Sequence, residues 1–216
     1  LSHNAWTLLR NADLEYQKKR GTQLASGFPN PTIGEKDDDK IRKSLDRFMN
    51  HFTAIVQDDG NGKVTGLCAE MGFINIINIE GESLVGLTKA GVDFCQIPSP
   101  IFDSEKIGKS ALSDDEILFL IQHMQSNLQD DWGLMIRILE WIEAGYNTPN
   151  ALDEMMEQHY GPQTKWKFSE SEYPSYKGGA LGRLTELGML GRRWENRSVR
   201  YVVTDKARRI MLEDLR

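Results

Sequence analysis

Apolar residues recur every three or four positions along much of the chain, and polar residues interrupt them at regular intervals. This spacing predicts helices, because residues three and four apart lie on one face of a helix. Six segments follow it: 8–24, 37–52, 113–128, 131–144, 148–161 and 172–187. Segment 131–144 is apolar on most sides, which predicts a central buried helix.

Capping residues mark where two of these helices begin. Ser113 and Glu116 have the spacing of a capping box, in which each side chain bonds the backbone of the other residue. Thr148 precedes Pro149, and a threonine cap followed by proline is typical of a first helical turn.

A different pattern precedes the middle of the chain. Residues 58–62 (DDGNG) predict a turn, and residues 64–71 predict a short helix that Gly72 ends in the left-handed conformation. The apolar strands that follow predict a β-hairpin over 73–87, which turns at 80–82. Thr88 would then cap another helix.

This order recurs 116 residues later. Residues 70–74 read EMGFI and residues 186–190 read ELGML, and with no gap Leu87-Thr88 falls on Val203-Thr204. Both copies predict a helix end, a glycine, a hairpin of one length, and an apolar–threonine step into a final helix.

The second copy, ALGRLTELGMLGRRWENRSVRYVVTDKARRIML over 180–212, resembles the winged helix-turn-helix superfamily. The first copy, GLCAEMGFINIINIEGESLVGLTKAG over 66–91, fits the same frame. The resemblance implies an α+β, mainly α fold with two winged-helix domains in tandem, each a helical bundle with a β-hairpin wing. We expect an interaction-type domain at 1–98, a linker at 99–112 and a DNA-binding domain at 113–216.

Charge is distributed unevenly along the chain. The net charge of −6 is the sum of −2 over residues 1–99, −9 over residues 100–163 and +5 over residues 164–216. An acidic protein with one cationic segment does not coat nucleic acid generally, but it fits a local DNA contact.

The cationic segment holds the candidate DNA-binding residues. The resemblance implies that helix 172–187 enters the major groove and that the hairpin after it contacts the backbone. The candidates are Lys165, Lys167, Ser175, Lys177, Arg183, Arg192, Arg193, Arg197 and Arg200. A solubilising charged hairpin is the other interpretation of these arginines. We expect Tyr176, Ala180, Leu184 and Leu187 to form the buried stripe of the helix, and Trp194 and Tyr201 to pack across the strands.

The first hairpin has the opposite character. Its residues 75–82 read NIINIEGE, with no basic side chain. Exposed isoleucines suit a protein interface, so Ile77 and Ile79 are predicted to bind a partner or a second copy of the chain in a dimer. The neighbouring helix over Ile41–Phe52 is predicted to take part.

No enzymatic constellation stands out, and we expect neither a cofactor nor a metal. The four histidines lack the spacing of metal ligands, and Asp37-Asp38-Asp39 fits a solvated helix start better than a cation site. Gly178-Gly179 permits a close approach or merely weakens its helix. Cys68 and Cys95 are expected to be unpaired thiols of a cytoplasmic protein, and no apolar segment is long enough to span a membrane.

These observations favour a non-enzymatic DNA-binding protein, acting as a transcriptional regulator or as an accessory factor of a DNA-processing complex. The alternative is an acidic tandem winged-helix scaffold that binds only proteins. The arginine-rich second hairpin favours the first interpretation, and the acidic segment 100–163 favours the second.

Overall fold

The computed structural model describes residues 10–11, 14–15, 17–19, 54–58, 61–79, 81–103, 111–195 and 198–214. The chain is mainly helical and divides into two compact units, Leu1–Phe119 and Leu120–Arg216. The division falls inside helix α6 (Asp114–Asn127). The predicted helix over 37–52 lies outside the described residues.

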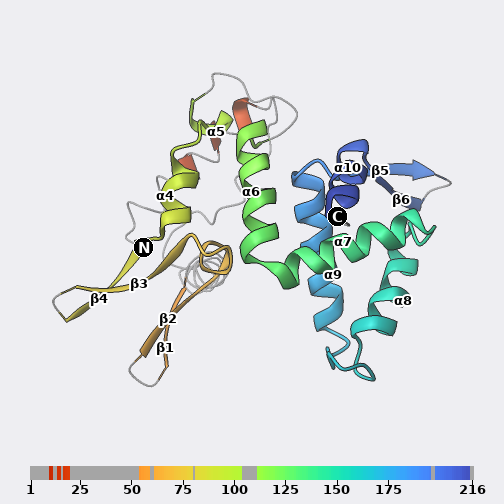
Figure 1. Ribbon diagram of the computed structural model, residues 1–216, viewed down its shortest axis with the longest axis horizontal. Helices are drawn as coiled ribbons and strands as arrows, with labels where there is room; N and C mark the ends of the chain where they lie inside the picture. Colours follow the sequence, from red (N-terminus) through yellow and green to blue (C-terminus); the bar gives the residue numbers. More distant parts are fainter. Residues whose placement is uncertain are drawn as a thin grey trace, which may run out of the picture. The chain divides into compact units, whose positions relative to one another are not determined.

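The first unit contains two β-hairpins and short helices (Figure 1). Its elements are β1 (Ala54–Asp58), β2 (Asn61–Thr65), α3 (Leu67–Glu70), β3 (Ile74–Ile79), β4 (Glu82–Leu87), α4 (Lys89–Cys95) and α5 (Pro100–Asp103). Three half-buried phenylalanines pack against one another in this unit. The rings of Phe73 and Phe94 stack with centroids 5.0 Å apart, and Phe119 is tilted against both.

The second unit is a helical bundle with one hairpin (Figure 1). After the end of α6, its elements are α7 (Gln129–Glu143), α8 (Pro149–Tyr160), α9 (Glu172–Glu186), β5 (Leu190–Glu195), β6 (Ser198–Val203) and α10 (Asp205–Asp214). Helix α7 is the central buried helix that its sequence predicts, with Met135, Ile138 and Leu139 fully enclosed. Helices α8 and α9 pack against it and against each other.

Several sequence predictions about helix ends are confirmed. At α6, the Ser113 amide donates to Glu116 Oε2 and the Glu116 amide donates to Ser113 Oγ, which is the reciprocal bonding of a capping box. At α8, the Ala151 amide donates to Thr148 Oγ1, and Pro149 is the first helical residue.

The 116-residue repeat is confirmed over its hairpin and flanking elements. Gly72 and Gly188 share a φ of 69°, and both hairpins pair six residues with six in the same antiparallel register. In each copy the threonine hydroxyl donates back to that glycine's carbonyl, from Thr88 over 2.7 Å and from Thr204 over 2.9 Å. The order helix, glycine, hairpin, threonine, helix is therefore the same in both units.

Two local predictions were wrong. Residues Val64 and Thr65 belong to strand β2 rather than to a helix, because they pair with β1, and α3 begins only at Leu67. Between them Gly66 turns the chain with a φ of 96°. In the second unit, Tyr176 is exposed, so the buried stripe of α9 is Ala180, Leu181, Leu184 and Leu187.

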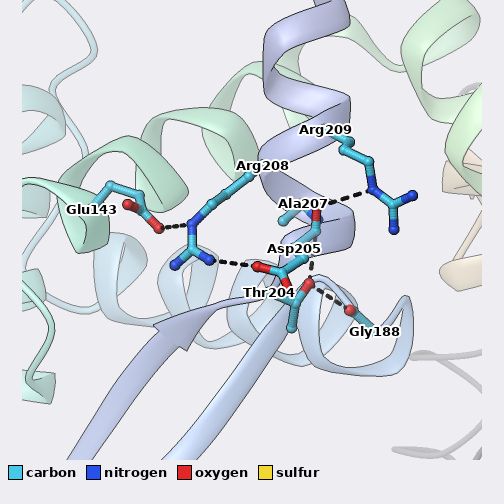
Figure 2. A network of polar contacts seen from close by, with 7 residues as sticks. All are labelled: Glu143, Gly188, Thr204, Asp205, Ala207, Arg208 and Arg209. Atoms are coloured by element: carbon cyan, nitrogen blue, oxygen red, sulfur yellow. Dashed lines mark hydrogen bonds and ion pairs between the residues drawn. The ribbon is translucent and has the colours of Figure 1, made fainter.

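A polar network holds the last helix of the second unit in place (Figure 2). Besides bonding Gly188, Thr204 Oγ1 accepts a hydrogen bond from the Ala207 amide and so caps α10. Arg208 reaches Glu143 at the end of α7 over 2.9 Å and Asp205 over 2.8 Å, and its pKa is raised mainly by the hydrogen bond to Glu143. The hairpin and α10 are thereby tied to the ends of α9 and α7.

We predict that Thr204→Val destabilises the second unit by about 1–2 kcal/mol, because valine keeps the shape of threonine but loses both hydrogen bonds. Urea denaturation followed by tryptophan fluorescence measures this, because Trp132 and Trp141 are buried in the second unit. Thr204→Ser keeps the hydroxyl and is the control. Equal losses for valine and serine would contradict the role given to the hydroxyl.

Candidate nucleic-acid interface

Helix α9 is the element in which the sequence predicts base contacts. The carboxylate of Glu172 accepts hydrogen bonds from the Ser169 amide (2.8 Å) and hydroxyl (2.7 Å), and these bonds fix the start of the helix. They also hold the pKa of Glu172 below its usual range, the backbone bond having the larger effect. Ser175, one turn later, is exposed, and its hydroxyl donates to the Ser171 carbonyl.

Lys177 points into the protein rather than to solvent. Its ammonium pairs with Asp153 of α8 and lies 3.5 Å from the Pro149 carbonyl oxygen, and its side chain is only 12% exposed. The sequence predicts Lys177 as a DNA-binding residue of this helix. The structure instead makes it a bridge between α9 and α8.

Arg183 is engaged in the same way on the other flank of the helix. Its guanidinium pairs with Asp131 in the first turn of α7, and both side chains are about a third exposed. The two predicted base-reading cations are thus bound to carboxylates of the acidic segment 100–163. With these pairs in place, α9 offers solvent no unpaired cation among its described residues.

The centre of the outward face of α9 is formed by glycines and carries no charge. A Cβ added at Gly178, Gly179 or Gly182 would meet no atom within 4 Å. No neighbouring backbone within the unit therefore requires these glycines. The sequence offers two interpretations of Gly178-Gly179, a close approach of another element or a locally weak helix. No element of the unit approaches the pair closely.

The hairpin β5–β6 carries cations on both faces. Arg192 is exposed, with its guanidinium carbon 6.0 Å from the ring centroid of the buried Tyr201. Arg193 is also exposed and lies opposite Arg200 in the register. Arg200 pairs with Glu195 over 3.0 Å and donates to Asn147 Oδ1 over 2.8 Å, so its charge is largely satisfied. Arg197 lies outside the described residues.

Trp194 stands out on this hairpin. It is 77% exposed, the largest exposure among the large apolar side chains that the structure describes. The sequence prediction of cross-strand packing is therefore wrong for Trp194, whereas it is confirmed for the buried Tyr201. Strand alternation places Trp194 on the face of Tyr201, but two register pairs nearer the turn, beyond the buried part of that face.

Lys165 and Lys167 lie on the segment between α8 and α9. Both side chains are exposed, and the Lys165 ammonium sits 5.1 Å from the ring centroid of Trp166. Lys167 adopts a φ of 53°, the left-handed conformation that side chains rarely take. Trp166 and Phe168 alternate with the two lysines, and the ring of Tyr160 in α8 lies against both of these rings.

The equivalent hairpin of the first unit presents aliphatic side chains. Ile77 occupies the position of Arg193, and Ile79 that of Glu195. Both isoleucines are exposed, at 43% and 50%, and Leu84 and Leu87 on the partner strand are exposed as well. The expectation that Ile77 and Ile79 are exposed on this hairpin is confirmed.

Reactive chemistry is sparse in the described part of the chain. Its residues include no group of three or more histidine, cysteine or acidic side chains poised to bind a metal. Cys68 and Cys95 are free thiols, and partial burial, with a smaller effect of Cys95, raises the pKa of Cys68. None of the described helices combines the length and apolar character that a bilayer crossing requires.

Comparison with protein-family models, with curated proteins and with solved structures finds no match to this chain.

We predict that Lys177→Met lowers stability by about 1 kcal/mol, because it removes the ammonium that links α9 to α8. Asp153→Asn and the double variant complete a mutant cycle measured by urea denaturation. A coupling energy near zero would show that the two side chains do not stabilise each other.

Proposed function

We propose that this protein is a non-enzymatic, two-module binding protein, with a DNA-contacting module in the second unit and a protein-binding module in the first. The succession of α7, α8, α9 and the hairpin β5–β6 supports a winged-helix assignment for the second unit. The backbone contact between Tyr201 N and Asn147 O, over 2.8 Å, supports it further, because it joins the wing to the segment between the first two helices.

The observation that carries the DNA proposal is the set of exposed side chains on strand β5, with Arg192 and Trp194 on one face and Arg193 on the other. Two guanidinium groups with no carboxylate partner among the described residues are suited to phosphate. An indole beside them is suited to stack on a base or to pack against a sugar. The hairpin, rather than the helix, is therefore the leading contact.

Helix α9 has a supporting role in this proposal. Its cations Lys177 and Arg183 would have to leave Asp153 and Asp131 before they read base edges. Breaking such pairs is unfavourable unless the new contacts are better. We therefore expect weak sequence preference and a shallow salt dependence, as for an accessory factor or regulator whose partner supplies the specificity.

We predict that the full chain shifts duplex DNA at low salt, with log Kobs falling by roughly two to three per decade of salt, because about two to three phosphates are neutralised. Arg193→Gln should reduce that slope by about one. Fluorescence anisotropy with labelled duplexes at several salt concentrations measures both quantities.

The matched control is Lys89→Gln, which removes one exposed positive charge from the first unit. It should leave the slope unchanged. Trp194→Ala should weaken binding at every salt concentration while preserving the slope, because indole contacts release no counterion. Absence of any shift at low salt, or equal effects of Lys89→Gln and Arg193→Gln, would contradict the proposal.

The second candidate function is a scaffold that binds only proteins, and the exposed aliphatic hairpin β3–β4 favours it. Ile77 lies opposite Leu84, and both are exposed on the same face of a two-stranded sheet. Exposed apolar side chains gathered on one element mark an interaction surface.

We predict that Ile77→Lys weakens self-association or partner capture by at least about tenfold, because an unpaired ammonium in an apolar contact is costly. Analytical ultracentrifugation over a concentration series measures self-association. Asn75→Lys, two residues away on the same face, adds the same charge without removing apolar surface and is the control. A chain that stays monomeric at every concentration would exclude a dimer through this hairpin.

A further inference from the structure

A hollow of about 440 Å³ lies within the second unit, apart from the hairpin β5–β6. One wall is the first half of α7, including Asp130, Gly133 and Arg137. The other wall is aromatic and comes from three further elements, with Tyr160, Trp166, Phe168 and Tyr176. Pockets of this size accommodate small organic ligands or a side chain of a partner.

The four aromatic rings form one connected cluster, in which Phe168 contacts each of the other three. Phe168 stacks on Tyr176 with centroids 4.7 Å apart and lies nearly parallel to Tyr160 at 6.1 Å. Trp166 is tilted by 50° against both Tyr160 and Phe168. Because Trp166 and Tyr176 are nearly half exposed, parts of their rings remain open to a ligand.

The charges around the hollow favour a cation. Asp131 is paired with Arg183, and Arg137 is paired with Glu140 over 2.9 Å. Asp130, in contrast, makes no ion pair within the described part of the chain. The start of a helix by itself attracts anions, but the full negative charge of Asp130 in the first turn of α7 outweighs the helix's partial positive charge of about one half.

The protein itself places a cation on this aromatic cluster. The Lys165 ammonium lies over the Trp166 ring at 5.1 Å from the centroid, a cation–π contact made by an exposed lysine. An exposed lysine side chain is readily displaced. An incoming cation can therefore take the same kind of contact with the ring and add the Asp130 carboxylate.

We propose that this hollow is a binding site for an alkylated ammonium group, recognised by the faces of Trp166 and Tyr176 and by the carboxylate of Asp130. The group belongs either to a free small molecule of the choline type or to a methylated lysine of a partner protein. The proposal does not depend on DNA binding, because it uses no residue of the hairpin β5–β6.

The experiment is a titration of the ¹⁵N-labelled full chain, followed through its indole N–H signals by NMR. Choline chloride is compared with 3,3-dimethylbutan-1-ol, which has the same shape without the charge. Trp166→Phe assigns the relevant signal. Choline should shift that signal with millimolar affinity, at least about fivefold tighter than the neutral alcohol, as a cation–π contact implies. The exposed Trp194 provides the internal control and should not respond.

Variants and a second ligand make the outcome decisive. Asp130→Asn should weaken choline binding several-fold, whereas Lys165→Ala should strengthen it about twofold because it removes the competing ammonium. A short peptide with trimethyllysine that binds more tightly than choline assigns the site to a protein partner, and the reverse assigns it to a small molecule. Equal binding of the neutral alcohol, equal response of Trp194, or tighter binding of adenosine monophosphate would overturn the proposal.

Discussion

Each unit is organised around one short contact between a threonine and a glycine sixteen residues before it. Gly188 adopts the left-handed conformation that lets the chain leave α9 and enter the hairpin, and Thr204 returns to bond its carbonyl at the hairpin's end. The same hydroxyl caps α10, so one side chain fixes the helix before the hairpin and the helix after it. Hairpin length follows from this closure, because strands of unequal length would carry the threonine away from the glycine. Gly72 and Thr88 repeat the arrangement in the first unit.

With the backbone set in this way, the two hairpins are free to differ in their side chains. In equivalent positions, Ile77 of the first unit and Arg193 of the second are both exposed, and Asn78 stands where Trp194 does. Burial at the base of the two hairpins also differs. Leu190 and Val203 are enclosed in the second unit, whereas Leu87, the counterpart of Val203, is exposed in the first. One frame therefore supports an aliphatic surface in one unit and a cationic, aromatic surface in the other. This divergence is the basis for proposing different kinds of partner for the two units.

The features that sequence predicted well are local ones. Helix spacing, the Ser113–Glu116 box and the Gly–hairpin–Thr frame depend on residues close together in the chain, and each appears as expected. The partners of Lys177 and Arg183 lie 24 and 52 residues away, and no periodicity reveals them. The prediction that Trp194 packs across the strands was wrong because strand alternation gives the face on which a side chain lies. It does not show how far along that face the buried core extends. The aromatic wall around Phe168 was missed because its rings come from three elements.

Acidic side chains of α7 and α8 act as internal counterions for the cationic end of the chain. Asp131 and Asp153 each take one cation of α9, and Glu143 takes Arg208 of α10. These ion pairs position the helices, but they also lower the positive potential of α9 and α10. A cation that is paired with a neighbouring carboxylate is less able to bind an external anion. On the hairpin β5–β6, in contrast, Arg192 and Arg193 are exposed and are not paired with these carboxylates. Because Arg183 pairs with Asp131 and Arg137 pairs with Glu140, neither arginine neutralises Asp130 beside the aromatic wall. The distribution of paired and unpaired charge thus separates the hairpin proposed to contact DNA from the hollow proposed to bind a cation, within one unit.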